Sequence, residues 1–190
     1  MLLDEAYVEF RSQIGKKIPI NEHRKNKGAF GHSAEKFKGM PLGSHHLDFE
    51  NGELKTGQIT HKNQLKEDFR ICSVWDKQYQ LDKMKNTLVV LRDMDDVIIY
   101  VEKMNLIANP VFYKYYHSEY DKIMDIGLDN ISQSDTCIWV AKTQSQGGDA
   151  PKKRSLYMAR SFASRLFGFS YPRVKGKHIH NELDEYESKL

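Results

Sequence analysis

The chain has 190 residues, of which 39% are hydrophobic, 29% charged and 11% aromatic, and its formal net charge is +3. These values predict one domain with a buried core and exclude a disordered chain, while the small positive charge is weak support for a polyanionic partner. The two cysteines exclude a disulfide framework and a thiolate zinc site. Apolar runs such as 88–91 are too short to cross a bilayer, and no signal peptide is recognisable, so we expect a cytoplasmic protein.

Hydrophobic spacing predicts two helices before residue 40. Apolar side chains recur at helical intervals over 2–15, with Gly15 as a stop, and again over 29–38, and a basic, polar segment joins the two. Asn51-Gly52 then separates two short predicted strands, 47–49 and 53–56, and is a strong signal for a hairpin turn.

The rest of the chain alternates predicted helices and strands. In order, the pattern predicts a helix over 77–86, strands over 88–91 and 97–101, a helix from Pro110 to Ile126, strands over 137–142 and 155–159, and a helix from an N-cap at Ser161 to about Gly168. Residues 176–190 are expected to form a polar tail. Helices at both ends of a mixed set of strands predict an α/β or α+β domain, with a mixed central sheet flanked by helices.

The predicted hairpin gathers charged side chains on one face. With a two-residue turn, Asp48, Glu50, Glu53 and Lys55 point to one side, because alternate residues of a strand share a face. Carboxylates placed in this way repel each other unless a cation neutralises them, and oxygen ligands suit magnesium. Bound magnesium can activate a water molecule and stabilise charge on a phosphodiester, and Lys55 would assist. The alternative is a solvated charged face, because this spacing arises readily in a chain with many charges.

A block around the hairpin resembles a known nuclease family. It consists of Asn26-Lys27-Gly28-Ala29-Phe30-Gly31-His32-Ser33-Ala34-Glu35, followed by Gly39, Gly43-Ser44, Asp48-Phe49 and Glu53-Leu54-Lys55-Thr56. This block is similar to the core of the MutH-type nucleases, which include the mismatch-repair nicking enzyme MutH and restriction enzymes such as MvaI. The spacing from Asp48 to Glu53 is closer to that of the MvaI-like branch, since the corresponding gap in MutH is longer.

The resemblance implies a restriction-endonuclease-like fold that hydrolyses DNA phosphodiesters with magnesium. A looser match at 81–85, before an apolar strand, adds a further active-site lysine. The catalytic residues implied by the resemblance are Glu35, Asp48, Glu53, Lys55 and Lys83. The implied magnesium ligands are Asp48, Glu53 and the carbonyl group of Leu54.

Residues 137–175 are expected to form the part of the domain that reads DNA. Residues 152–165 include several basic side chains and no acidic one, and 154–162 loosely resembles the C-terminal segment of the same family. A solvated basic face is the alternative. The candidate DNA contacts are Lys142, Lys152, Lys153, Arg154, Tyr157 and Arg160.

The sequence thus predicts a sequence-specific, type II restriction-type endonuclease that acts on double-stranded DNA with magnesium as cofactor. One alternative is a MutH-like strand nickase that depends on a repair partner. The other is a DNA-binding module without catalysis, whose acidic hairpin is structural. Both a monomer and a homodimer are compatible with the sequence, and a cognate methyltransferase would be a natural partner of a restriction enzyme.

Overall fold

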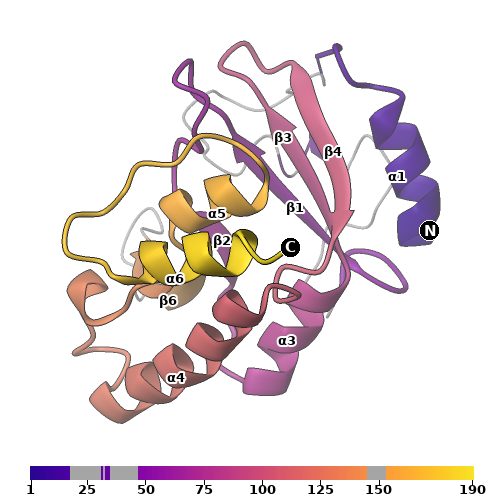
Figure 1. Ribbon diagram of the computed structural model, residues 1–190. Helices are drawn as coiled ribbons and strands as arrows, with labels where there is room; N and C mark the ends of the chain where they lie inside the picture. Colours follow the sequence, from indigo (N-terminus) through magenta and orange to yellow (C-terminus); the bar gives the residue numbers. More distant parts are fainter. Residues whose placement is uncertain (18–30, 32, 35–46, 145–152) are drawn as a thin grey trace.

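The computed structural model describes residues 1–17, 31, 33–34, 47–144 and 153–190. Within these ranges the chain is an α+β protein with five α-helices and two small sheets (Figure 1). In chain order the elements are α1 (Leu3–Arg11), β1 (Glu53–Gln58), β2 (Phe69–Cys72), α3 (Lys77–Lys85), β3 (Thr87–Arg92), β4 (Ile98–Met104), α4 (Pro110–Ile126), a 3-10 helix η1 (Gln133–Asp135), β5 (Trp139–Gln144), β6 (Lys153–Met158), α5 (Arg160–Leu166) and α6 (Ile179–Glu187). None of the helices in these ranges has both the length and the apolarity that a bilayer crossing needs.

The first sheet is mixed and has the strand order β1-β3-β4. β1 runs parallel to β3, with Glu53 opposite Thr87, whereas β4 is antiparallel to β3, with Val90 opposite Val101. All of β3 except its last residue is buried, as its run of apolar residues predicts. α1 lies beside this sheet, and its buried side chains belong to one cluster with those of β3 and β4 (Figure 1).

The second sheet is antiparallel and has the strand order β2-β6-β5. It shares a core with the first sheet, because one cluster of buried side chains includes Ile71 of β2, Leu91 of β3 and Phe162 of α5. The same cluster takes in apolar residues of α3, α4 and α6. The two sheets and these helices therefore pack around a common apolar interior.

The expectation of one central sheet is only partly correct. The strands predicted at 137–142 and 155–159 are β5 and β6, but they form a separate sheet with β2 instead of extending the mixed sheet. No predicted element covers β2, which is short and has the exposed Arg70 between buried neighbours. α4, by contrast, has the predicted bounds, and the Asn109 side chain accepts hydrogen bonds from the Val111 and Phe112 amides at its start.

Two predicted helix ends are also corrected. α1 ends at Arg11, and the chain continues in turns to Gly15, where φ is +84°. Ile14, expected on the apolar face of this helix, is 46% exposed. Ser161 is not an N-cap, because α5 begins at Arg160 and the buried Ser161 lies inside the helix.

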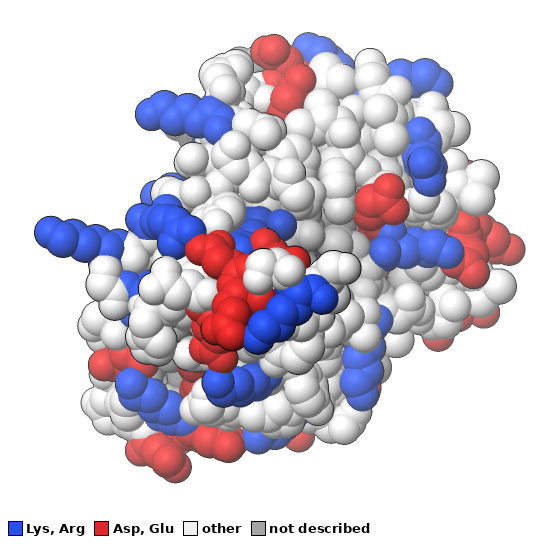
Figure 2. Space-filling view, in the orientation of Figure 1, with Lys and Arg blue, Asp and Glu red and all other residues white. Residues whose placement is uncertain are grey.

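Residues 176–190 do not form a polar tail. They contain α6, in which Ile179 and Leu183 are buried one turn apart against the main core. The prediction failed because the acidic residues of this segment were given more weight than Ile179 and Leu183, which have helical spacing. Acidic side chains gather over the outer face of α6, with basic side chains at their edges (Figure 2).

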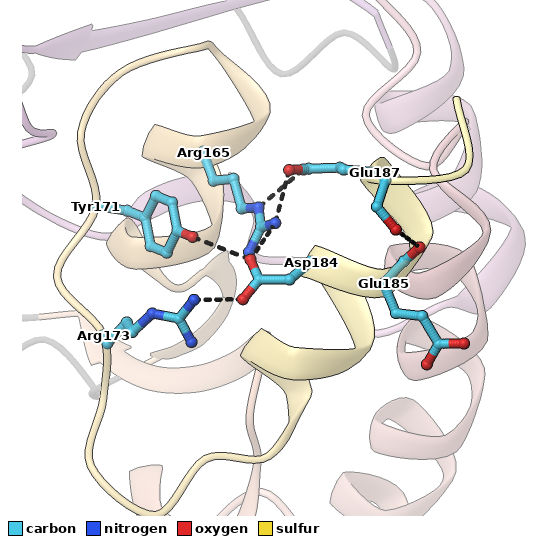
Figure 3. A network of polar contacts seen from close by, with 7 residues as sticks. Arg165, Tyr171, Arg173, Asp184, Glu185 and Glu187 are labelled. Carbon is cyan, nitrogen blue, oxygen red and sulfur yellow. Dashed lines mark hydrogen bonds and ion pairs between the residues drawn. The ribbon is translucent and has the colours of Figure 1, made fainter.

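A buried guanidinium group ties α6 to α5. Arg165 donates from Nε and Nη2 to the two carboxylate oxygens of Glu187, at 2.8 and 2.6 Å, and from Nη2 to Asp184 Oδ1 at 2.7 Å (Figure 3). Its side chain is only 5% exposed. Tyr171 and Arg173, from the loop between the two helices, also contact Asp184. Asp184 and Glu187 thus serve to dock the helix.

Candidate active site

The candidate site is centred on Glu53 at the start of β1. Its side chain is 4% exposed, and its two carboxylate oxygens accept from two different lysines. Lys55 Nζ donates to Oε1 at 2.5 Å, and Lys83 Nζ donates to Oε2 at 2.6 Å. Glu53 therefore holds two ammonium groups close together in a largely buried setting.

The topology explains why these three side chains meet. Lys55 lies two residues after Glu53 on one strand, so the two side chains share a face of β1. Lys83 lies in the last turn of α3, just before β3, and Glu53 is the partner of Thr87 at the start of β3. The Thr87 hydroxyl also donates to the Lys83 carbonyl at 3.0 Å, which secures the end of the helix beside Glu53.

Asp48 completes the cluster from the segment before β1. Its Oδ2 accepts from the backbone amide of Leu54 at 3.0 Å. Burial raises the pKa of Asp48, and the negative charge of Glu53 raises it further, whereas Lys55, the Leu54 amide and Lys83 act in the opposite direction. The charges of Glu53, Lys55 and Lys83 thus all influence the pKa of Asp48.

The turn of the predicted hairpin lies one residue before its predicted position at Asn51-Gly52. Between the two predicted strands, the backbone pairs only at Phe49 and Gly52, so Glu50 and Asn51 occupy the turn. β1 pairs along its length with β3 instead. Glu50 is exposed and pairs with the N-terminal ammonium group at 2.8 Å. It does not join the cluster, which has two carboxylates in the described ranges instead of the three expected from the hairpin.

Contacts outside the hairpin signal account for this turn. The Asn51 side chain accepts from the Leu3 amide at 2.8 Å, and Asn86 donates to the Asn51 carbonyl. Gly52 packs so tightly that a Cβ atom there would lie 2.7 Å from the Asn86 carbonyl oxygen. Glycine is therefore required by close packing against the α3–β3 connection.

The oxygen donors of the cluster fit magnesium in type. Asp48, Glu53 and the Leu54 carbonyl are hard ligands of the kind that magnesium prefers. Burial and mutual repulsion, which raise the pKa of Asp48, would be offset by a cation. No group of three or more His, Cys, Asp or Glu side chains comes together in the part of the chain that the structure describes. Glu35, the further carboxylate that the resemblance assigns to the active site, lies outside the described residues, as does most of the predicted helix 29–38.

Three of the candidate DNA contacts, Lys142, Tyr157 and Arg160, lie around Asp68, just before β2. Asp68 forms an ion pair with Lys142 and accepts from the Arg160 amide at 2.8 Å. The Lys142 ammonium group lies 5.9 Å from the centre of the Tyr157 ring. Lys142, Tyr157 and Arg160 are therefore neighbours, although Asp68 already neutralises one of their charges.

Arg154, another candidate DNA contact, makes a different contact. Arg154 is half-buried and donates to the Ala141 carbonyl at 3.4 Å, which is a structural contact across β5 and β6. Lys152 and the side chain of Lys153 lie outside the described residues. Two basic residues that were not predicted, Arg173 and Lys177, lie near Arg160 on the wall of a surface hollow. The basic run 173–178 was a visible signal for them.

Comparison with known proteins adds no family assignment. No protein-family model matches the chain, and no curated protein matches it. The resemblance to MutH-type nucleases therefore depends on the motif residues themselves. The structure adds to that motif the ion pairs of Glu53 with Lys55 and Lys83, and the influence of these three charges on the pKa of Asp48.

Proposed function

We propose that the chain is a magnesium-dependent, restriction-type endonuclease that hydrolyses phosphodiester bonds of double-stranded DNA at a specific sequence. The observation that carries this proposal is the pair of lysines, Lys55 and Lys83, that Glu53 holds beside Asp48. The motif resemblance assigns catalytic roles to these same residues. Side chains from 48 to 83 converge as a hydrolytic centre of this class would require.

The cluster has the charges needed to bind and activate a phosphodiester. Glu53 fixes both ammonium groups, so their positive charge is in place before a substrate arrives. Lys55 is the more accessible, with a side chain 14% exposed against 6% for Lys83. We therefore assign Lys55 to the attacking water and the developing negative charge on phosphorus, and Lys83 to holding Glu53 in position.

Asp48, Glu53 and the Leu54 carbonyl would hold the magnesium ion. When bound, magnesium would lower the pKa of a water ligand and neutralise charge on the phosphate. The two carboxylates and the two ammonium groups balance each other in charge, so a phosphodiester would add uncompensated negative charge. Because a divalent cation would neutralise this added negative charge, we expect the substrate and the cation to bind together.

Cleavage of DNA by the purified chain tests this proposal. Supercoiled plasmid and phage DNA are incubated with magnesium, and with EDTA as the negative control. Discrete fragments that require magnesium are the expected result, and their ends would define the recognition sequence. Open-circular plasmid without linear product would replace the proposal by a strand nickase. The exposed-carboxylate variant Glu50→Gln serves as a matched control, because it should cleave like the unaltered chain.

One observation favours a DNA-binding module without catalysis as the second candidate. Both oxygens of Glu53 are occupied by lysines, so the cluster is satisfied without a metal. In that case the four charged side chains would serve only to stabilise the junction of α3, β1 and β3. Saturable binding to duplex DNA with no cleavage in magnesium or manganese would support this candidate.

A further inference from the structure

A surface hollow beside the second sheet carries three basic side chains. Arg160 at the start of α5, and Arg173 and Lys177 from the loop between α5 and α6, lie on its wall. Thr136, which precedes β5, also lines it. None of these residues belongs to the Asp48–Glu53 cluster, so the hollow is a separate feature of the molecule.

The cations of this hollow are positioned by contacts of their own. Lys177 Nζ donates to the Thr136 carbonyl at 2.8 Å, which holds the ammonium group against the wall. Arg173 pairs with Asp184 of α6. Within the described residues, no carboxylate pairs with the guanidinium group of Arg160, which is exposed. Among the described residues, one cation therefore has no carboxylate partner and is available to an anion, and a second, Lys177, is held in the same wall.

Asp68 is the acidic residue on the same wall, and it does not cancel this charge. Its carboxylate forms an ion pair with Lys142 and accepts from the Arg160 amide. Asp68 is thus neutralised by a lysine outside the hollow, and it fixes the backbone from which the Arg160 side chain extends.

The Thr136 hydroxyl is an independent sign of a missing partner. Thr136 is 2% exposed, and its Oγ1 is buried without a hydrogen-bond partner. Buried hydroxyl groups are nearly always hydrogen-bonded, so we take the unpaired hydroxyl of a residue in the wall of the hollow as a donor for a group that binds there. A hydroxyl donor from a residue in the same wall as a guanidinium and an ammonium group is a combination that suits a phosphate oxygen.

We propose that this hollow binds one phosphate group, with Arg160 and Lys177 supplying the charge and Thr136 the neutral donor. The source that we favour is a backbone phosphate of DNA, and this choice rests on the proposed function. The position of Arg160 supports this choice, because Arg160 also lines a second hollow with His61 and Lys62. The basic surface is therefore longer than one phosphate group needs. A free phosphate or a phosphomonoester is the other source of the same chemistry.

Two variants separate binding from folding. Arg160→Gln removes a charge that has no described carboxylate partner, and Thr136→Val removes a hydroxyl that makes no hydrogen bond, so neither should lower the melting temperature. Lys175→Gln is the matched control, since Lys175 is exposed on the same loop and does not line the hollow. Inorganic phosphate is titrated into the ¹⁵N-labelled chain and followed by amide chemical shifts, and a duplex oligonucleotide is titrated in EDTA and followed by fluorescence anisotropy.

We expect Arg160→Gln to weaken phosphate binding about tenfold and Thr136→Val about fivefold, with no change in Lys175→Gln. A parallel loss of duplex affinity would identify the DNA backbone as the source, whereas unchanged duplex affinity would identify a free phosphate or a phosphomonoester. Unchanged binding of both probes by both variants would overturn the proposal. Because these titrations need no cleavage, their failure is distinguishable from failure of the nuclease assignment, which the plasmid assay tests.

Discussion

Lys83 Nζ donates a 2.6 Å hydrogen bond to Glu53 Oε2, although the two residues are 30 positions apart in the sequence. Both side chains are almost fully buried, with 6% and 4% of their surface exposed. A buried ion pair of this kind is costly to break from one side, because the remaining charge loses its partner inside the protein. The pair therefore makes stability depend on residues of the proposed active site.

Replacing Lys83 should destabilise the fold even in the absence of DNA. Lys83→Met leaves Glu53 with Lys55 alone, and we expect a loss of about 2 kcal/mol in the free energy of unfolding. The double variant Glu53→Gln/Lys83→Met should recover most of this loss, because neither charge then remains buried. Urea unfolding measures both, with the exposed Lys85→Met as control. Equal stability of Lys83→Met and the unaltered chain would show that the pair contributes nothing.

Asp48→Asn should raise the stability of the metal-free chain and remove the stabilisation that magnesium gives. Burial and Glu53 raise the pKa of Asp48, so its contribution to stability is present below the unfolded value and is lost as pH rises through the folded value. At neutral pH the metal-free Asn variant should therefore melt at a higher temperature than the unaltered chain. It should also lose the rise in melting temperature that magnesium gives, because a ligand is gone. The same magnesium effect on both proteins would contradict the assignment of Asp48 as a ligand.

His180 should make the fold sensitive to mild acid. Its ring is stacked on Phe162 and Tyr171, and its Nε2 accepts from the Val174 amide at 3.1 Å. Burial lowers the pKa of His180 below its ordinary value of 6.5, and the charges of Arg173 and Arg165 lower it further. The stabilising effect of the neutral ring is thus present above pH 6.5 and is lost as pH falls through the lowered value.

Unfolding experiments between pH 7 and about 5 test this effect of His180. We expect the free energy of unfolding to fall with pH in the unaltered chain, and to change much less in His180→Gln. His178→Gln, on an exposed histidine at the start of the same helix, should keep the full pH dependence. If all three proteins respond alike, another group is responsible.

The docking of α6 should require arginine at position 165. A lysine cannot reproduce the paired hydrogen bonds to Glu187, so Arg165→Lys should cost about 2 kcal/mol and speed amide hydrogen exchange in α6. The exposed ion pair of Lys189 with Glu185 offers a comparison, since Lys189→Gln should leave the free energy of unfolding nearly unchanged. Unaltered exchange in α6 of Arg165→Lys would refute the role given to Arg165.

The elements that could be predicted from the sequence are those determined by local signals. Pro110 at a first helical position and the apolar run of β3 both gave the observed elements. Elements determined by distant contacts were missed. The turn before β1 is set by Leu3 and Asn86, and α6 is held by Arg165, and no local pattern contains such information.

The same distinction holds for the candidate site. Asp48, Glu53, Lys55 and Lys83 could be named from the motif and its order along the chain, and the structure brings them together. Glu50 was wrongly added to the cluster because the turn was placed one residue too late. The alternation of side chains along a strand was then counted from the wrong residue, whereas Glu50 pairs with the N-terminus. Thr136 was missed because a surface hollow depends on loops that meet only in the folded chain, whereas Lys177 lies in a basic run that is visible in the sequence.

The most direct test of the nuclease assignment is single-turnover cleavage of a duplex by Lys55→Ala in magnesium, with DNA binding measured in parallel. Lys85→Ala, which removes an exposed lysine from the end of α3, is the control. If Lys55 stabilises the developing charge at phosphorus, its removal should slow cleavage by about 100-fold or more while duplex affinity changes little. Cleavage by Lys55→Ala at the rate of the control would contradict the assignment of this cluster as the catalytic centre.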